Sequence, residues 1–177
     1  VDTIYQIEDK SNAQTIEIKK SNIDFKDVFF NYDSNEKNVL KNINLNIEGG
    51  KMTALVGHSG SGKSTILNLI PRFYQQQSGN ILIDSQDITK VSLHSLRSKI
   101  SLVSQDIILF DDNVENNIKY AKSDATQDEI KNACKLAAAD EFIETLPEKY
   151  KTNIGENGIR LSGGQKQRLS IARAIIK

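Results

Sequence analysis

One segment constrains the fold of this chain more than any other: the run GHSGSGKS at residues 57–64, which matches the pattern GxxxxGK[ST]. The run before it, MTALVG, is short and almost wholly apolar, which predicts a strand buried on both faces of a sheet. The run after it, STILNLI, has helical spacing and ends at Pro71. A glycine-rich loop between such a strand and a helix is the context in which this pattern binds phosphate.

The loop also suits a polyphosphate chemically. Its glycines tolerate unusual backbone angles and let N–H groups approach phosphates closely, and a helix N-terminus adds the positive end of its dipole. We expect Lys63 to reach the β and γ phosphates and Ser64 to bind Mg²⁺. A flexible Gly/Ser loop is the alternative, but a chance match occurs at on the order of one position in thirty thousand. MgATP or MgGTP is therefore expected at Gly57, His58, Ser59, Gly60, Ser61, Gly62, Lys63, Ser64 and Thr65.

Composition excludes several other classes. The 177 residues fit one domain, and 23 basic against 23 acidic residues give a formal net charge of +0, so no overall field attracts nucleic acid. We expect no nucleic-acid partner. The single cysteine, Cys134, is interpreted as a small buried hydrophobe in a reducing compartment. No apolar run approaches the roughly 20 residues that span a bilayer, so we expect the 177-residue chain to be soluble.

The remaining pattern predicts an α/β architecture. Residues 1–20 are polar and lack periodicity, which indicates a linker. From Ile23 strand-like runs begin, and one of them alternates Ile and Leu with Asn, which predicts a single solvent-facing side. A helical subdomain is expected at about 113–165, followed by an amphipathic helix. We predict a mostly parallel core sheet flanked by antiparallel strands. The predicted strands are IDFKDVFFNY, VLKNINLNI, MTALVG, NILID and ISLVS.

A second glycine motif, LSGGQ at residues 161–165, starts this last helix. Ser162 is suited to cap the helix or to donate to a phosphate oxygen, and Gly163 and Gly164 permit close backbone approach. Taken alone, a simple helix-capping turn explains it equally well. Paired with GxxxxGK[ST] about a hundred residues upstream, however, LSGGQ resembles the signature of the ABC ATPase family. The resemblance covers nearly all of residues 23–177.

The resemblance implies the nucleotide-binding domain of an exporter. Its fold is a P-loop NTPase (RecA-like) core with a mostly parallel sheet, an N-terminal antiparallel β subdomain and an inserted α-helical subdomain. Residues 1–20 correspond to a linker from a membrane domain of the same polypeptide and residues 21–177 to the ATP-binding domain. Two copies are expected to form a head-to-tail homodimer at the cytoplasmic face of a membrane. In that dimer Ser162, Gly163, Gly164 and Gln165 contact, in trans, the ATP held by the partner's phosphate loop.

Further residues take their expected roles from the same resemblance. Tyr32 resembles the aromatic residue that stacks on adenine, the alternative being a structural tyrosine at a strand end. Gln105 resembles the glutamine that touches Mg²⁺ or the attacking water, the alternative being a solvent-facing loop residue. Lys63 and Gln105 are thus the catalytic candidates, and Ser64 and Gln105 the metal ligands. Asn157 departs from the arginine often found in its loop.

The subfamily and the missing parts follow from longer stretches. IPRFYQQQSGNILIDSQDI and LFDDNVENNI resemble multidrug and lipid-flippase exporters, which implies a lipid or hydrophobic substrate. Gln76 and Ser85 stand where a proline and a glycine are common. In the family the catalytic Asp-Glu pair and a switch histidine follow the signature helix, and this sequence ends at Lys177 before them. We therefore expect the C-terminal part of the fold to be missing and the 177-residue chain to be inactive by itself.

Two other readings stay open. The first is a soluble ABC protein that acts on ribosomes or DNA as a mechanical switch; the exporter-like stretch around Gln105 and the lack of a basic patch argue against it. The second is a nucleotide-binding fragment without catalysis of its own.

Overall fold

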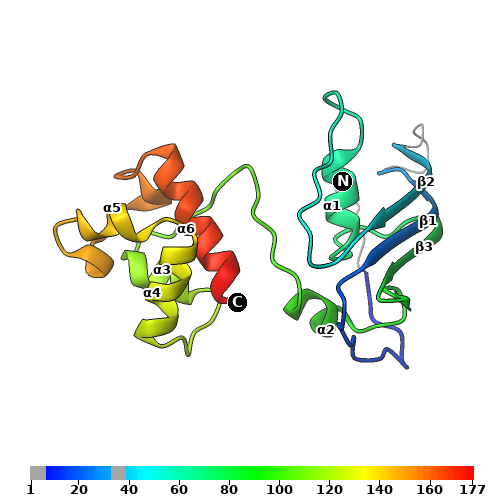
Figure 1. The fold of residues 1–177 in the computed structure, drawn as a ribbon, viewed down its shortest axis with the longest axis horizontal. Helices are drawn as coiled ribbons and strands as arrows, with labels where there is room; N and C mark the ends of the chain where they lie inside the picture. Colours follow the sequence, from blue (N-terminus) through cyan, green and yellow to red (C-terminus); the bar gives the residue numbers. More distant parts are fainter. Residues whose placement is uncertain (1–6, 33–38) are drawn as a thin grey trace. The chain divides into compact units, whose positions relative to one another are not determined.

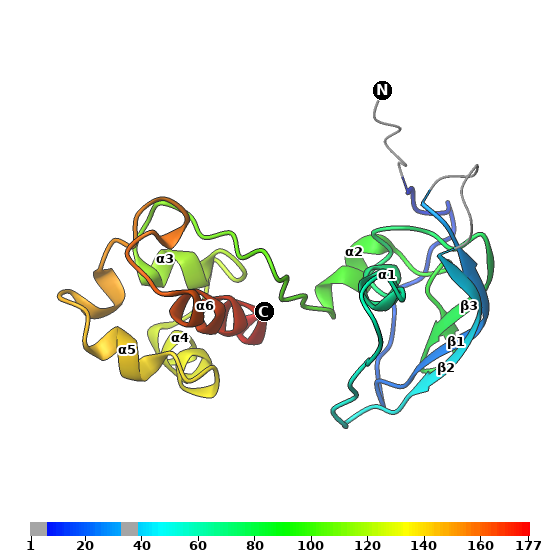
Figure 2. The same cartoon turned by 90° about the horizontal axis from the view of Figure 1, so that it is seen from above.

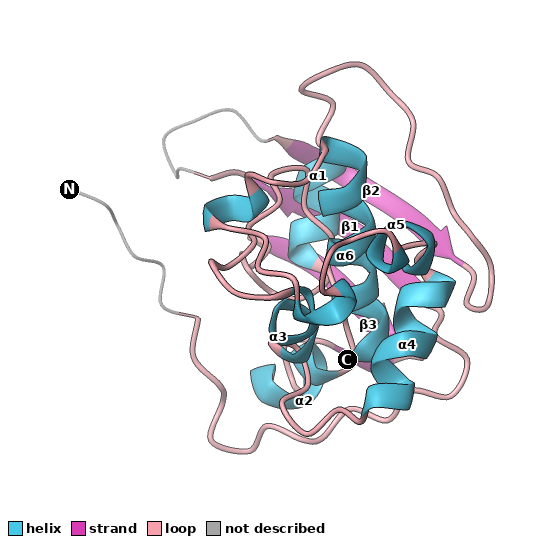
Figure 3. Cartoon of the chain, turned by 90° about the vertical axis from the view of Figure 1, so that its left-hand side faces the viewer, coloured by secondary structure: helices cyan, strands magenta, loops and turns pink. Residues whose placement is uncertain are grey.

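The computed structural model describes residues 7–32 and 39–177 of the chain (Figure 1). It divides into two compact units, residues 1–100 and 101–177. All the named strands lie in the first unit, and the second is built from helices and loops within the described residues (Figure 3). The combination of strands and helices agrees with the α/β class predicted from the sequence.

The first unit is organised around a four-stranded antiparallel sheet of order β2-β1-β3-β4. The register of the sheet places Ile23 of the first strand opposite both Ile47 and Ile83. The antiparallel strands predicted at the start of the domain are therefore confirmed. The strands are β1 (Ile23–Phe30), β2 (Leu40–Ile47), β3 (Ser78–Ile83) and β4 (Gln86–Asp87).

Strand β1 lies between β2 and β3 in the sheet, and its apolar side chains face the core of this unit. Phe25, Val28 and Phe30 are buried, and the register shifts around Asp27 mark a bulge in which Asp27 has a φ of 50°. Gly79 of β3 crosses that bulge closely, since a Cβ there would lie 2.3 Å from the Asp27 carbonyl oxygen. Only glycine fits at this crossing.

Two short helices, α1 (Lys63–Leu69) and α2 (Leu93–Ser98), lie on one face of the sheet (Figures 1 and 2). Their apolar residues and the inner face of the sheet form one hydrophobic core. Its buried members are Ile16, Phe25, Val28, Phe30, Leu40, Ile66, Leu69, Ile70, Ile81, Ile83, Ile88, Val91 and Leu96.

Two predicted strands, MTALVG and ISLVS, are absent, and the expectation of a parallel sheet is wrong for the described residues. Residues 52–57 and 101–104 have no regular secondary structure, and Met52 and Val56 are 99% and 89% exposed. The physical reason is that a strand is stable only beside a hydrogen-bonding neighbour. Within the described residues no strand runs alongside either segment, so neither has a partner for a strand ladder there.

The segment before β1 is fastened to the first unit by one carboxylate. Asp84 Oδ2 accepts hydrogen bonds from the backbone N–H groups of Lys19, Lys20 and Ser21 at 2.7 to 3.1 Å, and Oδ1 accepts one from Asn22 at 2.9 Å. These bonds, that of Lys19 foremost, lower the pKa of Asp84 to about 2. The residues predicted as a linker thus include a stretch held against this unit.

Asp84 also begins the turn that contains Ser85. Both residues have left-handed backbones, with φ values of 47° and 66°, and they join β3 to β4 in a two-residue turn. Such turns need positive φ at both central positions, where glycine is favoured. The positive φ explains why a glycine is common at this position, where Ser85 adopts the same left-handed conformation.

The second unit contains helices α3 (Val114–Lys119), α4 (Gln127–Leu136), α5 (Asp140–Glu144) and α6 (Gly163–Ile176), with short 3₁₀ turns η1 (Lys149–Lys151) and η2 (Glu156–Gly158). Polar side chains start the helices: Asn113 accepts from Asn116 N at 2.8 Å, and Thr126 forms a capping box with Glu129. Cys134 is fully buried, which confirms its interpretation as a core residue, and burial raises its pKa to about 11.

The core of the second unit is formed by one face of each α-helix together with loop residues. In the described part of the chain, no helix has the length and apolar character that crossing a bilayer requires. The buried members are Leu109, Val114, Ile118, Ala125, Ile130, Ala133, Cys134, Ala137, Ala139, Phe142, Ile143, Ile154, Leu161, Leu169, Ala172 and Ile176.

Candidate nucleotide-binding site

The phosphate loop (residues 57–64) takes its shape from its glycines. Gly60 and Gly62 have φ values of 78° and 87°, in the left-handed region that other residues rarely adopt. A Cβ on Gly62 would lie 2.5 Å from Leu40 Cδ2, so the loop needs glycine for packing as well. The Gly62 carbonyl then accepts from Ile66 N at 2.9 Å and starts α1.

The Lys63 ammonium group lies over the inside of this loop. It donates to the carbonyl oxygens of Gly57 at 2.9 Å and His58 at 2.7 Å, and to Ser61 Oγ at 3.3 Å. All these acceptors are uncharged, and no ion pair of Lys63 with a carboxylate is present among the described residues. The positive charge is therefore available to an anion that enters the loop.

A cavity of about 310 Å³ connects this loop with the predicted base-stacking residue, Tyr32. The Tyr32 hydroxyl is 2.9 Å from Thr65 Oγ1, and either oxygen is able to donate. The structure thus brings Tyr32 and residues 59–65 together around one space, with an aromatic ring beside a glycine loop. The lining residues are Tyr32, Val39, Ser59, Gly60, Ser61, Gly62, Lys63, Ser64 and Thr65.

These groups fit a magnesium–nucleotide complex. The loop offers left-handed glycines, an ammonium group that no carboxylate of residues 7–32 or 39–177 pairs with, and the exposed Ser64. Backbone N–H groups and a cation suit phosphate oxygens, and a hydroxyl oxygen is a ligand that Mg²⁺ accepts. Gln105, the other predicted metal ligand, is an exposed loop residue of the second unit, and its contact with Mg²⁺ stays a prediction.

Tyr32 is braced by two aromatic neighbours. Its ring lies edge-on to those of Phe30 and Tyr74, with centroids 4.9 Å away in each case, and Tyr32 is 40% exposed. Sequence reasoning missed Tyr74, because only the fold brings residue 74 beside residue 32. An exposed ring with a fixed edge has an open face for a planar base.

Replacement of Tyr32 tests this arrangement. We expect ATP and GTP to bind the unmodified chain within about one order of magnitude of each other, because stacking does not distinguish bases. Tyr32→Ala should weaken both by about 1 to 3 kcal/mol, the usual contribution of base–aromatic stacking. Calorimetry measures both affinities. Tyr32→Phe is the matched control, since it keeps the ring and loses only the bond to Thr65; an alanine variant with unchanged affinities would show a purely structural tyrosine.

The signature loop (residues 161–165) lies in the second unit, at the start of α6. Ser162 caps this helix: Gln165 N donates to Ser162 Oγ at 3.3 Å, and Ser162 N donates to Gln165 Oε1 at 2.8 Å. The capping interpretation is therefore correct, but it does not explain the glycines. A Cβ on Gly163 or Gly164 would meet nothing within 4 Å in the described part of the chain.

Asn157 has a local explanation. It has a φ of 49° and a ψ of 27°, inside the 3₁₀ turn η2. Asparagine adopts this left-handed conformation more readily than other non-glycine residues. Asn157 therefore suits the turn better than the arginine often found at this position.

A family model described as ABC transporter matches residues 40–177, which include both glycine motifs. The chain belongs to the ABC transporter family. The resemblance and the P-loop NTPase class predicted from residues 57–64 and 161–165 are thereby confirmed.

Relatives of this ABC transporter chain are exporters by name. Multidrug export ATP-binding/permease proteins of Staphylococcus aureus strains NCTC 8325 and bovine RF122 are 52% and 51% identical over 176 residues, or 99% of this chain. The chain spans about 30% of the length of these relatives. A solved structure of a bacterial Atm1-family ABC exporter with ATP bound is 41% identical, with a TM-score of 0.93 over 98% of this chain and 30% of that one.

Proposed function

We propose that this chain is the ATP-binding engine of an ABC exporter, in which ATP-driven closure of two such domains powers the transport of a lipid or another hydrophobic substrate. The observation that carries the proposal is the cavity in which the Lys63 ammonium group and the Tyr32 ring face one space. The exporter names of the relatives support the direction of transport.

Each residue of the cavity has a distinct role in this proposal. Tyr32 stacks on the base, the loop N–H groups and Lys63 hold the phosphates, and the Ser64 hydroxyl coordinates Mg²⁺ together with Gln105. The bound nucleotide supplies the phosphoryl group that is transferred to water. Because Lys63 forms no ion pair with a carboxylate among the described residues, we expect its charge to stabilise the negative charge that develops during that transfer.

The open signature loop supports a second copy as the partner. Gly163 and Gly164 leave space over the start of α6, and backbone N–H groups with the Ser162 hydroxyl suit the γ-phosphate held by another chain. We infer a head-to-tail homodimer with two ATP molecules between its halves. Binding then closes the dimer, and hydrolysis with product release reopens it.

For the full-length protein, the proposal includes a part that lies in the membrane. A transmembrane domain of the same polypeptide would form the substrate path, with the nucleotide-binding domains at its cytoplasmic face. The resemblance to multidrug and lipid-flippase exporters favours lipid or other hydrophobic substrates.

Reconstitution of the full-length protein tests the function. In proteoliposomes, we expect ATP to drive the movement of a fluorescent phospholipid or a hydrophobic cationic dye, with initial rates at least tenfold above those with a non-hydrolysable ATP analogue. A protein that hydrolyses ATP, moves neither probe and is stimulated by ribosomes or DNA would instead support the soluble switch.

A further inference from the structure

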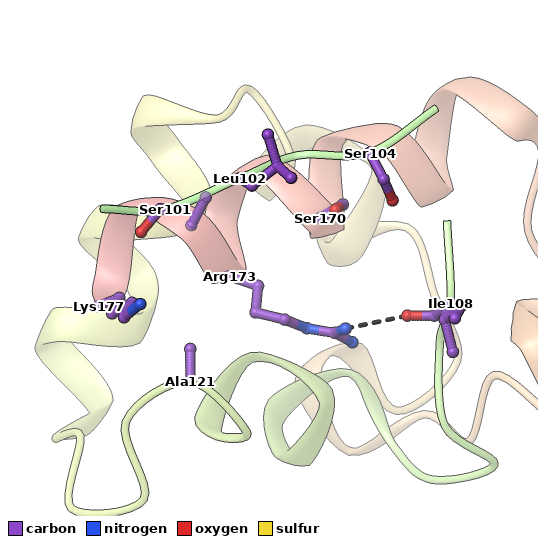
Figure 4. A pocket seen from close by; sticks show the side chains of 9 residues that line it. Ser101, Leu102, Ser104, Ile108, Ala121, Ser170, Arg173 and Lys177 are labelled. Carbon is purple, nitrogen blue, oxygen red and sulfur yellow. Dashed lines mark hydrogen bonds between the residues drawn. The ribbon is translucent and has the colours of Figure 1, made fainter. Parts of the chain in front are cut away.

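Arg173 connects the signature helix to a loop on the far side of a pocket of about 250 Å³ in the second unit (Figure 4). The side chain extends from α6, and its Nη1 donates to the Ile108 carbonyl oxygen at 2.9 Å. Its Nε and Nη2 donate to the backbone and side-chain oxygens of Asn117, each at 2.9 Å. One planar group thus bonds the loop at Ile108 and helix α3 at Asn117, which fixes its own orientation between the two.

Asn117, in α3, extends this connection to the same loop. It is only 1% exposed, and its amide nitrogen donates to the carbonyl oxygens of Phe110 and Asn113 at 3.0 Å. Its amide oxygen accepts from Phe110 N at 2.9 Å as well as from Arg173. The buried amide therefore uses both donors and both acceptor sites, and it bonds both the N–H and the carbonyl group of Phe110.

The guanidinium group also supports two exposed aromatic rings. It lies 5.4 Å from the centroid of Phe110 and 5.9 Å from that of Tyr120, and the two rings are 4.3 Å apart. Phe110 and Tyr120 are 38% and 70% exposed. The cation–π contacts hold these rings at the surface, although their apolar area is not buried.

All hydrogen-bond acceptors of Arg173 in the described part of the chain are neutral. An ion pair therefore does not account for its place here, and a lysine with the same charge lacks the planar fork that reaches three acceptors at once. What the site requires is the geometry of the guanidinium group. The planar guanidinium group therefore suits a role in fixing the position of the loop at Ile108.

Arg173 and Asn117 together form a clamp on the loop at residues 108–110. This loop lies between two predicted functional elements. Ile108 follows Gln105 by three residues, and Arg173 lies 11 residues after Ser162 on one uninterrupted helix, about three turns or 16 Å away. A helix transmits rigid-body displacement over this length. A movement of the loop at Ile108 and Phe110 is thus passed to Ser162 through Arg173.

We propose that Arg173 is a positioning residue for ATP hydrolysis, because it holds the segment after Gln105 rigidly to the signature helix. This rests on the proposed function, in which Gln105 and Ser162 both act on ATP. Loss of the clamp leaves nucleotide binding at the phosphate loop intact, since no residue of that loop belongs to the clamp. It lowers turnover, because catalytic groups misplaced by about 1 Å lose up to a hundredfold in rate.

The test uses the full-length protein with Arg173→Lys. We expect kcat for ATP hydrolysis to fall at least tenfold and KM for ATP to stay within threefold. Backbone amide exchange in a peptide covering residues 105–112 should become at least tenfold faster. Arg168→Lys is the matched control, because Arg168 lies on the same helix but over the ring of Phe142, 5.4 Å from its centroid. The control should leave all three measurements within twofold of the unmodified protein.

Asn117→Ala provides a second route, should Arg173→Lys fold poorly. If the two residues form one clamp, the double variant should have the kcat of the worse single variant, whereas independent residues would give the product of both losses. Unchanged amide exchange in residues 105–112, or faster exchange with a normal kcat, would overturn the proposal. An unmodified protein that hydrolyses no ATP would contradict the proposed function, and the exchange comparison alone would then decide whether Arg173 is a clamp.

Discussion

Lys63→Ala should reduce ATP affinity roughly tenfold to hundredfold, because it removes a charge-assisted contact worth about 1.5 to 3 kcal/mol. Within the described part of the chain, the acceptors of the Lys63 ammonium group are all neutral: the carbonyl oxygens of Gly57 and His58 and the Ser61 hydroxyl. Nothing in its described surroundings competes with phosphate through a negative charge. Isothermal titration calorimetry with MgATP measures the loss directly.

Two controls separate binding from folding in this experiment. Lys51→Ala removes one positive charge from an exposed residue that pairs with Glu48 and does not line the cavity at the phosphate loop, and it should leave ATP affinity within twofold. A thermal unfolding midpoint close to that of the unmodified protein shows that the Lys63 variant is folded. If the folded Lys63→Ala chain binds MgATP with unchanged affinity, the phosphate loop is not the nucleotide site.

Ser162→Arg should abolish ATP-dependent dimerisation and leave ATP binding to the monomer nearly intact. Gly163 and Gly164 have open space over their backbones, and Ser162 is exposed at the start of α6. A large side chain fills that space, where the partner's γ-phosphate is expected, and removes the serine hydroxyl. The phosphate loop belongs to the other unit of the chain and keeps all its own contacts.

The experiment uses the complete domain with its catalytic glutamate neutralised, so that ATP accumulates in the closed dimer. Light scattering reports the dimer, and nucleotide titration reports binding to the monomer. Gln167→Arg is the matched control, since it adds the same side chain to an exposed position on the same helix. Because Ser162 also caps α6, Ser162→Ala distinguishes a lost cap, worth about 1 kcal/mol, from the steric block. Parallel loss of binding and dimerisation would contradict an action in trans.

The local sequence was sufficient for most of the nucleotide site. Glycines, a lysine and a hydroxyl at fixed spacing fold into a phosphate loop through short-range geometry, and the left-handed backbones of Gly60 and Gly62 agree with the unusual angles expected of its glycines. The capping box of Ser162 is equally local. Tyr32 was found only through the family resemblance, because a tyrosine at the end of a strand has no distinctive local pattern.

The strands were the least predictable part. MTALVG and ISLVS carry a strand-like pattern, yet Met52 and Val56 are exposed and neither segment pairs. A strand depends on neighbours distant in sequence, so an apolar pattern alone does not make one. The need for neighbours also explains why the prediction of the antiparallel strands was confirmed: β1 has partners on both sides, at β2 and β3.

By itself, therefore, the sequence was enough to identify the family of this chain and to predict which residues bind phosphate and which helix start contacts a second chain. Tertiary structure alone decided the contacts between distant segments. It placed Tyr32 beside Thr65, fastened residues 19–22 to Asp84, and joined Arg173 to the Ile108 loop across 65 positions. The physical reason is that motifs are set by short-range backbone geometry, whereas these contacts form only when packing brings together groups whose separation in the chain no pattern records.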